Sequence, residues 1–178
     1  DLLTKADALA KEIEALPEDV PGDFRTVLPF SGLHARVYAL NAPLLRARGL
    51  PPISVWQRNR WDMLTPTDAP DPAEVKAPPS IEVHLMRNEV RGAAFNVTNA
   101  GDDATTAVIG ITGLPGGTNP RCVTVREVLF TDTKDRAPIA AALPEAQKTA
   151  RGYKVGLPAG CSRPVWWSFE TGGVEAGA

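Results

Sequence analysis

Tryptophans carry the most distinctive chemistry in this sequence. A flat indole face suits the C–H face of a pyranose ring, so aligned tryptophans could form a sugar-stacking platform. Two of them are adjacent within a predicted strand, so their side chains point to opposite faces of the sheet. We therefore expect one of that pair in the core, and the other to pack the helical part of the chain onto the sheet together with an upstream tryptophan. The four candidates are Trp56, Trp61, Trp166 and Trp167.

A polar cluster at Arg87, Asn88 and Glu89 is the second candidate site. One hypothesis is a sugar or ion contact at a sheet edge. The other is a turn or bulge, in which Asn88 tolerates a left-handed backbone and Glu89 pairs with Arg91 or Arg126. The turn is the favoured interpretation, because an exposed ion pair of this kind is common and contributes little.

The chain has two cysteines, Cys122 and Cys161. They are too few for a disulfide-rich scaffold or a zinc site. Each precedes an apolar, strand-like run, so the two could meet across a sheet. In an extracytoplasmic protein a disulfide between them is one hypothesis, and two buried thiols is the other.

No pattern in the sequence predicts catalysis or a cofactor. Nucleophile-elbow, phosphate-loop and dinucleotide fingerprints are missing from it. His34 and His84 have no Cys, Asp or Ser at catalytic or metal-ligand spacing. Calcium requires about six to eight oxygen ligands, whereas Asp102–Asp103, Asp132 and Asp135 occur in turn contexts, where Asp caps the backbone. We expect no catalytic residue, no metal and no cofactor, and a hydrolase would need two facing carboxylates that nothing here predicts.

The composition is that of an ordinary globular protein. The 178 residues are 43% hydrophobic and 22% charged, enough for one domain, or for a smaller domain with an appendage. A formal net charge of -2 gives no electrostatic case for nucleic acid as a partner. No apolar run approaches the length of a membrane span.

The first 50 residues predict a helical hairpin. Apolar residues recur every three or four positions from Leu2 to Leu16, which defines one helical face. A second helical pattern starts near Asp23 and, after an interruption, continues to a C-cap at Gly49. Pro43 lies inside it and predicts a kink or break. One face of the hairpin must rest on another body, either the sheet or a neighbouring domain.

Residues 51–79 form a predicted Pro-rich strap that begins with the extended stretch Pro51–Trp56. The boundary between the helical part and the sheet domain is expected near residue 78. Over residues 80–178, alternating apolar residues separated by turn residues predict an antiparallel β-sandwich, of immunoglobulin-like or jelly-roll-like type, which lacks its last strand. Pro138–Ala146 is Ala-rich, and we interpret it as a connection with a short turn of helix. The predicted strands are Ile81–Met86, Arg91–Asn99, Thr105–Thr112, Cys122–Phe130, Tyr153–Leu157 and Pro164–Glu170.

An ordered series of motifs spans Ser80 to Gly177: MRNE, AAFNVTNAG, GLPGG, VTVREVLFTDT and LPAGCSRPVWWSFE. The series resembles the β-sandwich domain that precedes the catalytic barrel in large secreted bacterial proteins related to the β-N-acetylgalactosaminidase family of glycoside hydrolases. In such proteins the acid/base carboxylates lie in the barrel, so none is carried over to this chain. The closing strand of such domains, usually G-x-Y-x-G, is missing before the chain stops at Ala178.

The resemblance implies a non-catalytic accessory module of a larger secreted, periplasmic or cell-surface protein, with a neighbouring domain or chain of that protein as its partner. We expect both ends of the chain to be cut ends, because Asp1 leads directly into a helix and the final residues complete no element. We also expect a strand from elsewhere to pair with the incomplete sheet edge. The alternative function is a carbohydrate-binding module that uses exposed tryptophan faces.

Overall fold

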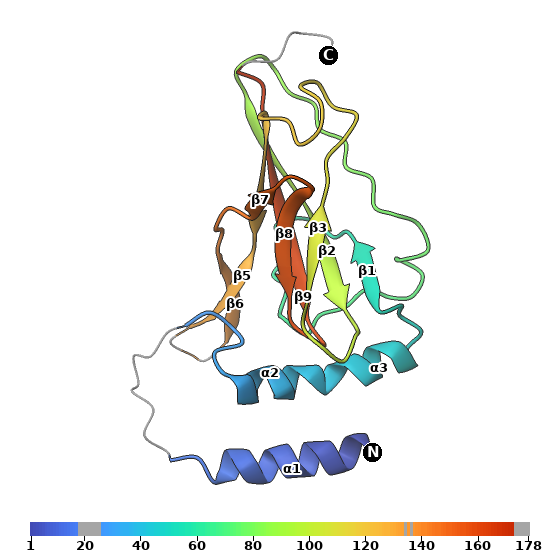
Figure 1. Ribbon diagram of the computed structural model, residues 1–178, viewed down its shortest axis with the longest axis vertical. Coiled ribbons are helices and arrows are strands. Elements are labelled where there is room, and N and C mark those ends of the chain that lie inside the picture. Colours follow the sequence, from blue (N-terminus) through green and yellow to red (C-terminus); the bar gives the residue numbers. More distant parts are fainter. Residues whose placement is uncertain (18–25, 134, 136, 173–178) are drawn as a thin grey trace.

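The protein is mainly β, with antiparallel sheets and a small helical N-terminal part (Figure 1). The computed structural model describes residues 1–17, 26–133, 135 and 137–172. Its helices are α1 (Leu2–Glu14), α2 (Gly32–Ala39) and α3 (Asn41–Ala47). Its strands are β1 (Ile53–Trp56), β2 (Val90–Asn99), β3 (Thr105–Ile109), β4 (Val123–Glu127), β5 (Leu129–Asp132), β6 (Pro138–Ala142), β7 (Gln147–Thr149), β8 (Gly152–Leu157) and β9 (Ser162–Glu170).

A four-stranded sheet, in the order β1-β2-β9-β4, forms the centre of the molecule. Its longest pairing joins β2 to β9 over nine registered positions. Alternate residues of these strands face a second sheet, β3-β8-β7, and the two sheets share one hydrophobic core. The buried members of that core are Val97, Ile111, Val123, Val125, Ala146, Tyr153, Val155, Leu157 and Val165.

Strands β2, β3, β8 and β9 confirm four of the predicted strands to within a few residues. The run predicted as one strand from Cys122 to Phe130 is divided at Val128. There the chain changes partner: β4 pairs with β9, the Val128 amide donates to the Pro164 carbonyl (3.1 Å), and β5 pairs with β6. A short two-stranded sheet therefore extends from the end of β4.

The prediction of a strand at Ile81–Met86 is wrong. These residues alternate between half-buried and exposed side chains, as expected from their period-two pattern, but they form no ladder with another strand. An extended segment alternates in this way whenever one of its faces packs against the protein, whether or not its backbone is hydrogen-bonded to a neighbouring strand. The segment therefore packs as an extended coil before β2.

The prediction of a helical connection at Pro138–Ala146 is also wrong. Its first part is β6, which pairs with β5, and Glu145 forms an isolated bridge with Arg126 of β4. Pro138 is the first residue of its strand, a position where the missing amide proton costs no ladder hydrogen bond. Pairing with β5 outweighs the low strand propensity of alanine.

The sheet begins earlier in the chain than the boundary expected near residue 78. Residues 53–56, part of the predicted strap, form edge strand β1 and pair with residues 96–99 of β2. The rest of the strap also belongs to the fold, because the Pro66 carbonyl accepts from the Ser162 amide at 2.8 Å and Pro70 is buried. The strap thus contributes to the body of the β part.

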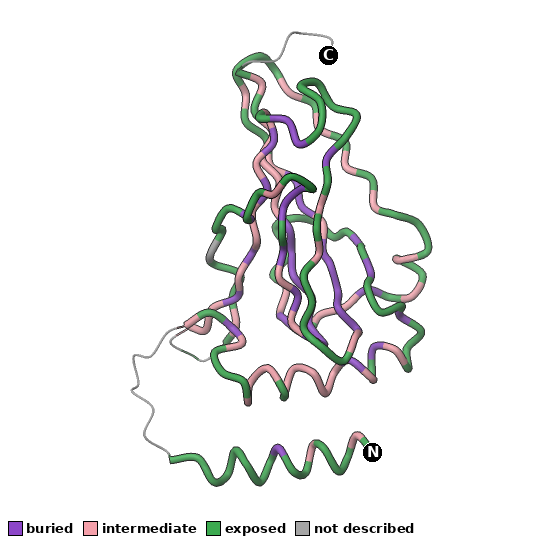
Figure 2. Tube along the Cα trace, viewed as in Figure 1, coloured by how far each residue is buried: buried purple, intermediate pink, exposed green. Residues whose placement is uncertain are grey.

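The helices lie across one end of the β part, with α2 and α3 against it and α1 outside them (Figure 1). Gly160, in the turn before β9, lies so close to α2 that an added Cβ would stand 2.0 Å from the Tyr38 carbonyl oxygen. Asn41 Nδ2 donates to the Gly160 carbonyl at 2.8 Å. The predicted hairpin thus rests on strand ends, and α1 is mostly exposed, with only Leu9 buried (Figure 2).

Local signals account for the helix ends. Asp1 and Ser31 cap α1 and α2 through their side chains, and Gly49, at φ 94°, ends the helical part as predicted. The predicted break lies at Leu40, three residues before Pro43. Pro43 is accommodated in the first turn of α3, where amide protons lack helical acceptors. The predicted start near Asp23 lies outside the described residues.

Candidate functional site

The surface with the most suggestive chemistry surrounds Trp61, in the segment after β1. Its side chain is 71% exposed. The Trp61 amide donates to Asn59 Oδ1 at 3.0 Å, a side-chain turn that fixes the backbone at this point. The indole lies against Trp166 of β9, with ring centroids 5.7 Å apart and planes tilted by 59°. The structure therefore brings together two of the four tryptophans singled out in the sequence.

Trp166 is placed by Gly92 on the neighbouring strand. A Cβ added at residue 92 would stand 2.4 Å from Trp166 Cζ2, so only glycine lets the indole lie against β2. Arg60 adds a third contact, since its Nη1 donates to the Gly92 carbonyl and its guanidinium lies 5.5 Å from the Trp61 ring centroid. Trp61 thus contacts both a tryptophan and an arginine and is still largely exposed.

A shallow hollow with a volume of about 390 Å³ adjoins Trp61. It is lined by residues 57–61, Ile81, Glu82, Ala93 and Ala94. Arg58, on the same segment, lies 4.9 Å from the Trp56 ring centroid and 3.9 Å from Glu74. The hollow therefore combines one aromatic face with guanidinium, amide and carboxylate groups.

Trp56 is a structural residue. It is 0% exposed, and its Nε1 donates to Thr98 Oγ1 at 2.8 Å. Thr98 Oγ1 also lies 2.6 Å from Ser162 Oγ, so the three side chains form a buried chain of hydrogen bonds across β1, β2 and β9. A saccharide cannot reach this indole.

Trp167 points to the opposite face from Trp166, as predicted for adjacent strand residues. It packs against Phe95 and Phe169 beside the core between the sheets. The contacts of α2 and α3 with the β part come from Asn41, Arg46, the Gly160 turn and the packing of Leu45 with Ala100. The tryptophans are seen instead against strand residues and one another.

The Arg87–Asn88–Glu89 cluster forms a turn. The Glu89 amide donates to the Met86 carbonyl at 3.2 Å, and Asn88 adopts the left-handed backbone with φ 59°. A hydrogen bond from the Met86 amide, and then the contact with Arg91, lower the pKa of the Glu89 carboxyl. The bonds of Glu89 therefore serve the turn before β2.

In the structure Cys122 and Cys161 are both free thiols. Cys161 is buried beside the β8–β9 turn, and burial raises its pKa to about 12. Cys122 is half-buried, and its Sγ lies 3.8 Å from the Pro115 carbonyl oxygen. The thiols are unlinked in the structure, and of the two only Cys161 is fully buried.

The remaining titratable candidates lie apart from one another. His34 packs between Phe30 and Tyr38, and burial lowers its pKa. His84 Nε2 lies 3.0 Å from Glu82 Oε1, and both side chains are exposed. Within the described ranges, no three His, Cys, Asp or Glu side chains converge as metal ligands. The helices of the described part are also too short and too polar to cross a membrane.

Sequence reasoning missed Arg58, Asn59, Arg60 and Glu82 as neighbours of Trp61. A local signal was present in the run Trp56-Gln57-Arg58-Asn59-Arg60-Trp61, which has a tryptophan at each end and amide and guanidinium side chains between them. The position of Glu82 could not be read from spacing, since the strap brings it back to this segment over some twenty intervening residues.

No family model and no curated protein matches this chain.

Proposed function

We propose that this chain is a non-catalytic accessory module of β-sandwich type, within a larger extracytoplasmic bacterial protein of the carbohydrate-active kind. The sandwich assignment is supported by the shared core between the β1-β2-β9-β4 and β3-β8-β7 sheets. Its role is to hold a neighbouring domain or chain of the same protein in place.

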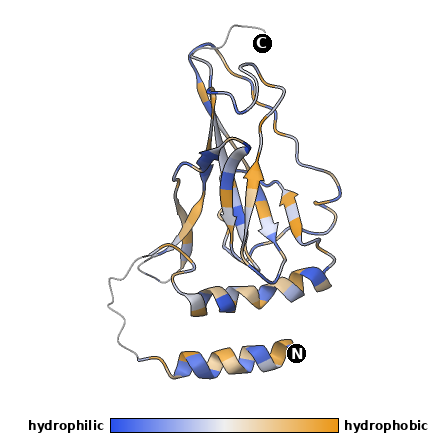
Figure 3. Cartoon of the chain, viewed as in Figure 1, coloured by the Kyte–Doolittle hydropathy of each residue, from blue (hydrophilic) through white to orange (hydrophobic). Residues whose placement is uncertain are grey.

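The observation that carries this proposal is the outer edge of β1. In the part of the chain that the structure describes, β1 pairs only with β2. Ile53 and Val55 are 43% and 39% exposed on this strand, and its apolar residues stand out at the edge of the sheet in Figure 3. An unpaired apolar edge is a template for an added strand.

Two of the other sheet edges, at β4 and β7, are better protected. Beyond β4, the Ala146 amide donates to the Val125 carbonyl at 2.9 Å and the Glu127 amide to the Pro144 carbonyl at 3.0 Å, so the chain itself covers that edge. β7 presents Gln147 and Lys148, polar residues of the kind that discourage pairing. Compared with the edges at β4 and β7, β1 is the more open place for a partner strand to add; β3 and β6 also lie at sheet edges, with Val108 and Ile139 exposed.

The proposal is tested by expressing this chain and the remainder of its parent protein as separate polypeptides and measuring their association by calorimetry. Val55→Lys introduces a charge at the edge and is expected to weaken association by at least about tenfold. Met63→Lys is the matched control, because Met63 is 88% exposed in the strap. It is expected to leave association unchanged.

Association that is equally strong in the wild-type chain and in Val55→Lys would contradict β1 as the interface. Turnover of a glycoside by the isolated chain would contradict a non-catalytic role. Urea unfolding of both variants shows whether either change acts through folding.

A further inference from the structure

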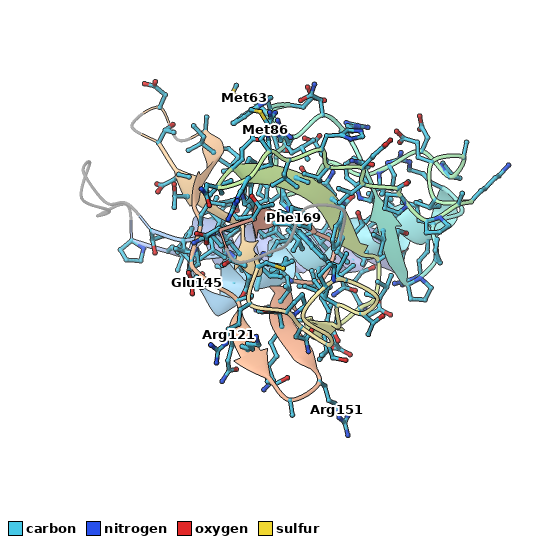
Figure 4. The ribbon with its side chains drawn as sticks, turned by 90° about the horizontal axis from the view of Figure 1, so that it is seen from above. Met63, Met86, Arg121, Glu145, Arg151 and Phe169 are labelled. Atoms are coloured by element: carbon cyan, nitrogen blue, oxygen red, sulfur yellow. The ribbon has the colours of Figure 1, made fainter. Side chains whose placement is uncertain are left out.

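We propose that the hollow beside Trp61 is a binding site for a neutral saccharide. This inference is independent of strand addition at β1, because it concerns the surface formed by the strap over β2. Figure 4 shows Met63 of the strap and Met86 of the extended segment before β2 on one side of the molecule, and Arg151, in the β7–β8 turn, on the opposite side.

The aromatic part of the site is exposed and held in place. Trp61 is 71% exposed, whereas Trp56 is fully buried and Trp167 packs beside the core. Trp166 contacts the Trp61 ring at 5.7 Å and Arg60 lies 5.5 Å from its centroid, so the indole is fixed before a ligand arrives. A pre-positioned indole binds a pyranose C–H face with little loss of side-chain entropy.

The polar part of the site matches sugar hydroxyls, each of which both donates and accepts. Gln57 and Asn59 offer amide donors and acceptors, Arg58 offers guanidinium donors, and Glu82 offers carboxylate acceptors around the same hollow. Hydrogen bonds to the charged members are the stronger ones. The volume of about 390 Å³ lies within the range of about 300–1,000 Å³ typical of small-ligand sites.

Charge and shape argue against two other ligands of exposed tryptophans. Glu82 lines the hollow beside Arg58 and Arg60, and Glu74 lies 3.9 Å from Arg58, so two carboxylates offset the two arginines and no cationic track for a phosphate backbone results. A proline-rich peptide needs a groove lined by several aromatic rings, and Trp61 alone supplies the aromatic lining here. A neutral saccharide needs neither a cationic track nor an aromatic groove.

The test is titration of the full chain with cellohexaose, chitohexaose, xylohexaose and mannohexaose, followed by calorimetry and tryptophan fluorescence. At least one of these four probes is expected to bind and to change the fluorescence. Trp61→Ala is expected to weaken that binding at least about tenfold, a loss of about 1.4 kcal/mol. Met63→Ala is the control, because Met63 lies on the same segment and is 88% exposed. It is expected to leave binding unchanged.

A second variant, Glu82→Ala, keeps the indole and removes a hydroxyl acceptor, so it is expected to weaken the same probe by a smaller factor. Circular dichroism checks that each variant is folded. Absence of binding by all four probes would overturn the proposal, as would binding that survives Trp61→Ala. Binding only of a decaproline peptide or of oligothymidylate would replace the saccharide with that ligand and overturn it equally.

Discussion

Trp166 of β9 lies against Gly92 of β2, and the indole occupies the space that a side chain at residue 92 would need. The two residues belong to adjacent strands, where Gly92 pairs with Ser168 and Ala94 with Trp166. This contact places the Trp166 ring against Trp61, the exposed tryptophan of the site. The position of the candidate site therefore depends on a glycine that contributes no side chain to it.

Gly92→Ala should destabilise the protein. The new methyl group would stand 2.4 Å from Trp166 Cζ2, so the indole must move, and overpacking of this kind costs about 1–3 kcal/mol. Urea unfolding measures the change in free energy of unfolding. Gly32→Ala is the control, since its added Cβ meets nothing within 4 Å. An equal effect of the two substitutions would contradict the Trp166 contact.

Gly160→Ala should loosen the helices from the β part. The residue has φ 70°, and its added Cβ would stand 2.0 Å from the Tyr38 carbonyl oxygen. Gly113→Ala is the matched control, because Gly113 has φ 78° with open space around it. We expect about 1 kcal/mol for the control from backbone strain alone, and a clearly larger loss for Gly160→Ala. Both losses are measured by thermal and urea unfolding.

The two thiols should differ in reactivity. Cys161 is 3% exposed, whereas Cys122 is half-buried. Burial raises the pKa of Cys161 to about 12, so almost no thiolate is present at neutral pH. In Ellman's assay we expect at most one thiol, that of Cys122, to react in the folded protein, and two thiols to react in the unfolded protein. Release of no thiol in denaturant without reductant would indicate a disulfide between Cys122 and Cys161 and contradict this prediction.

Stability should fall as the pH rises above 9. Burial raises the pKa of Cys161 from 9.0 to about 12, and burial followed by the nearby Cys161 charge raises that of Tyr38 from 10.0 to about 12. Both groups are neutral when protonated, so the unfolded chain ionises first. Their contribution is complete below pH 9 and is lost as the pH rises to about 12. Cys161→Ala should make this decline shallower, as measured by urea unfolding at several pH values.

The sequence predicted strands well where alternation and pairing coincide. In β2, β8 and β9 the alternating residues face a shared core, so one pattern reports both packing and hydrogen bonding. Ile81–Met86 has the same alternation without a partner strand, and β6 has a partner strand without the usual residues. Pairing is a long-range property, and local spacing does not contain it.

The candidate site was predictable only in part. The type of residue was visible, because the segment from Trp56 to Trp61 carries two tryptophans with arginine and amide side chains between them. Which tryptophan is exposed was not visible, since Trp56 and Trp61 lie in the same polar segment and differ in their contacts with β2. The burial of Trp56 depends on its hydrogen bond to Thr98, a residue forty-two positions away.

Hydrogen exchange at β1 tests the proposed role most directly. Amides of residues 53–56 that point away from β2 have no acceptor in the described part of this chain. We predict that these amides exchange rapidly in the isolated chain, and at least about a hundredfold more slowly in the parent protein, where an added strand would protect them. Equal exchange in the two proteins would contradict β1 as the edge that receives a partner.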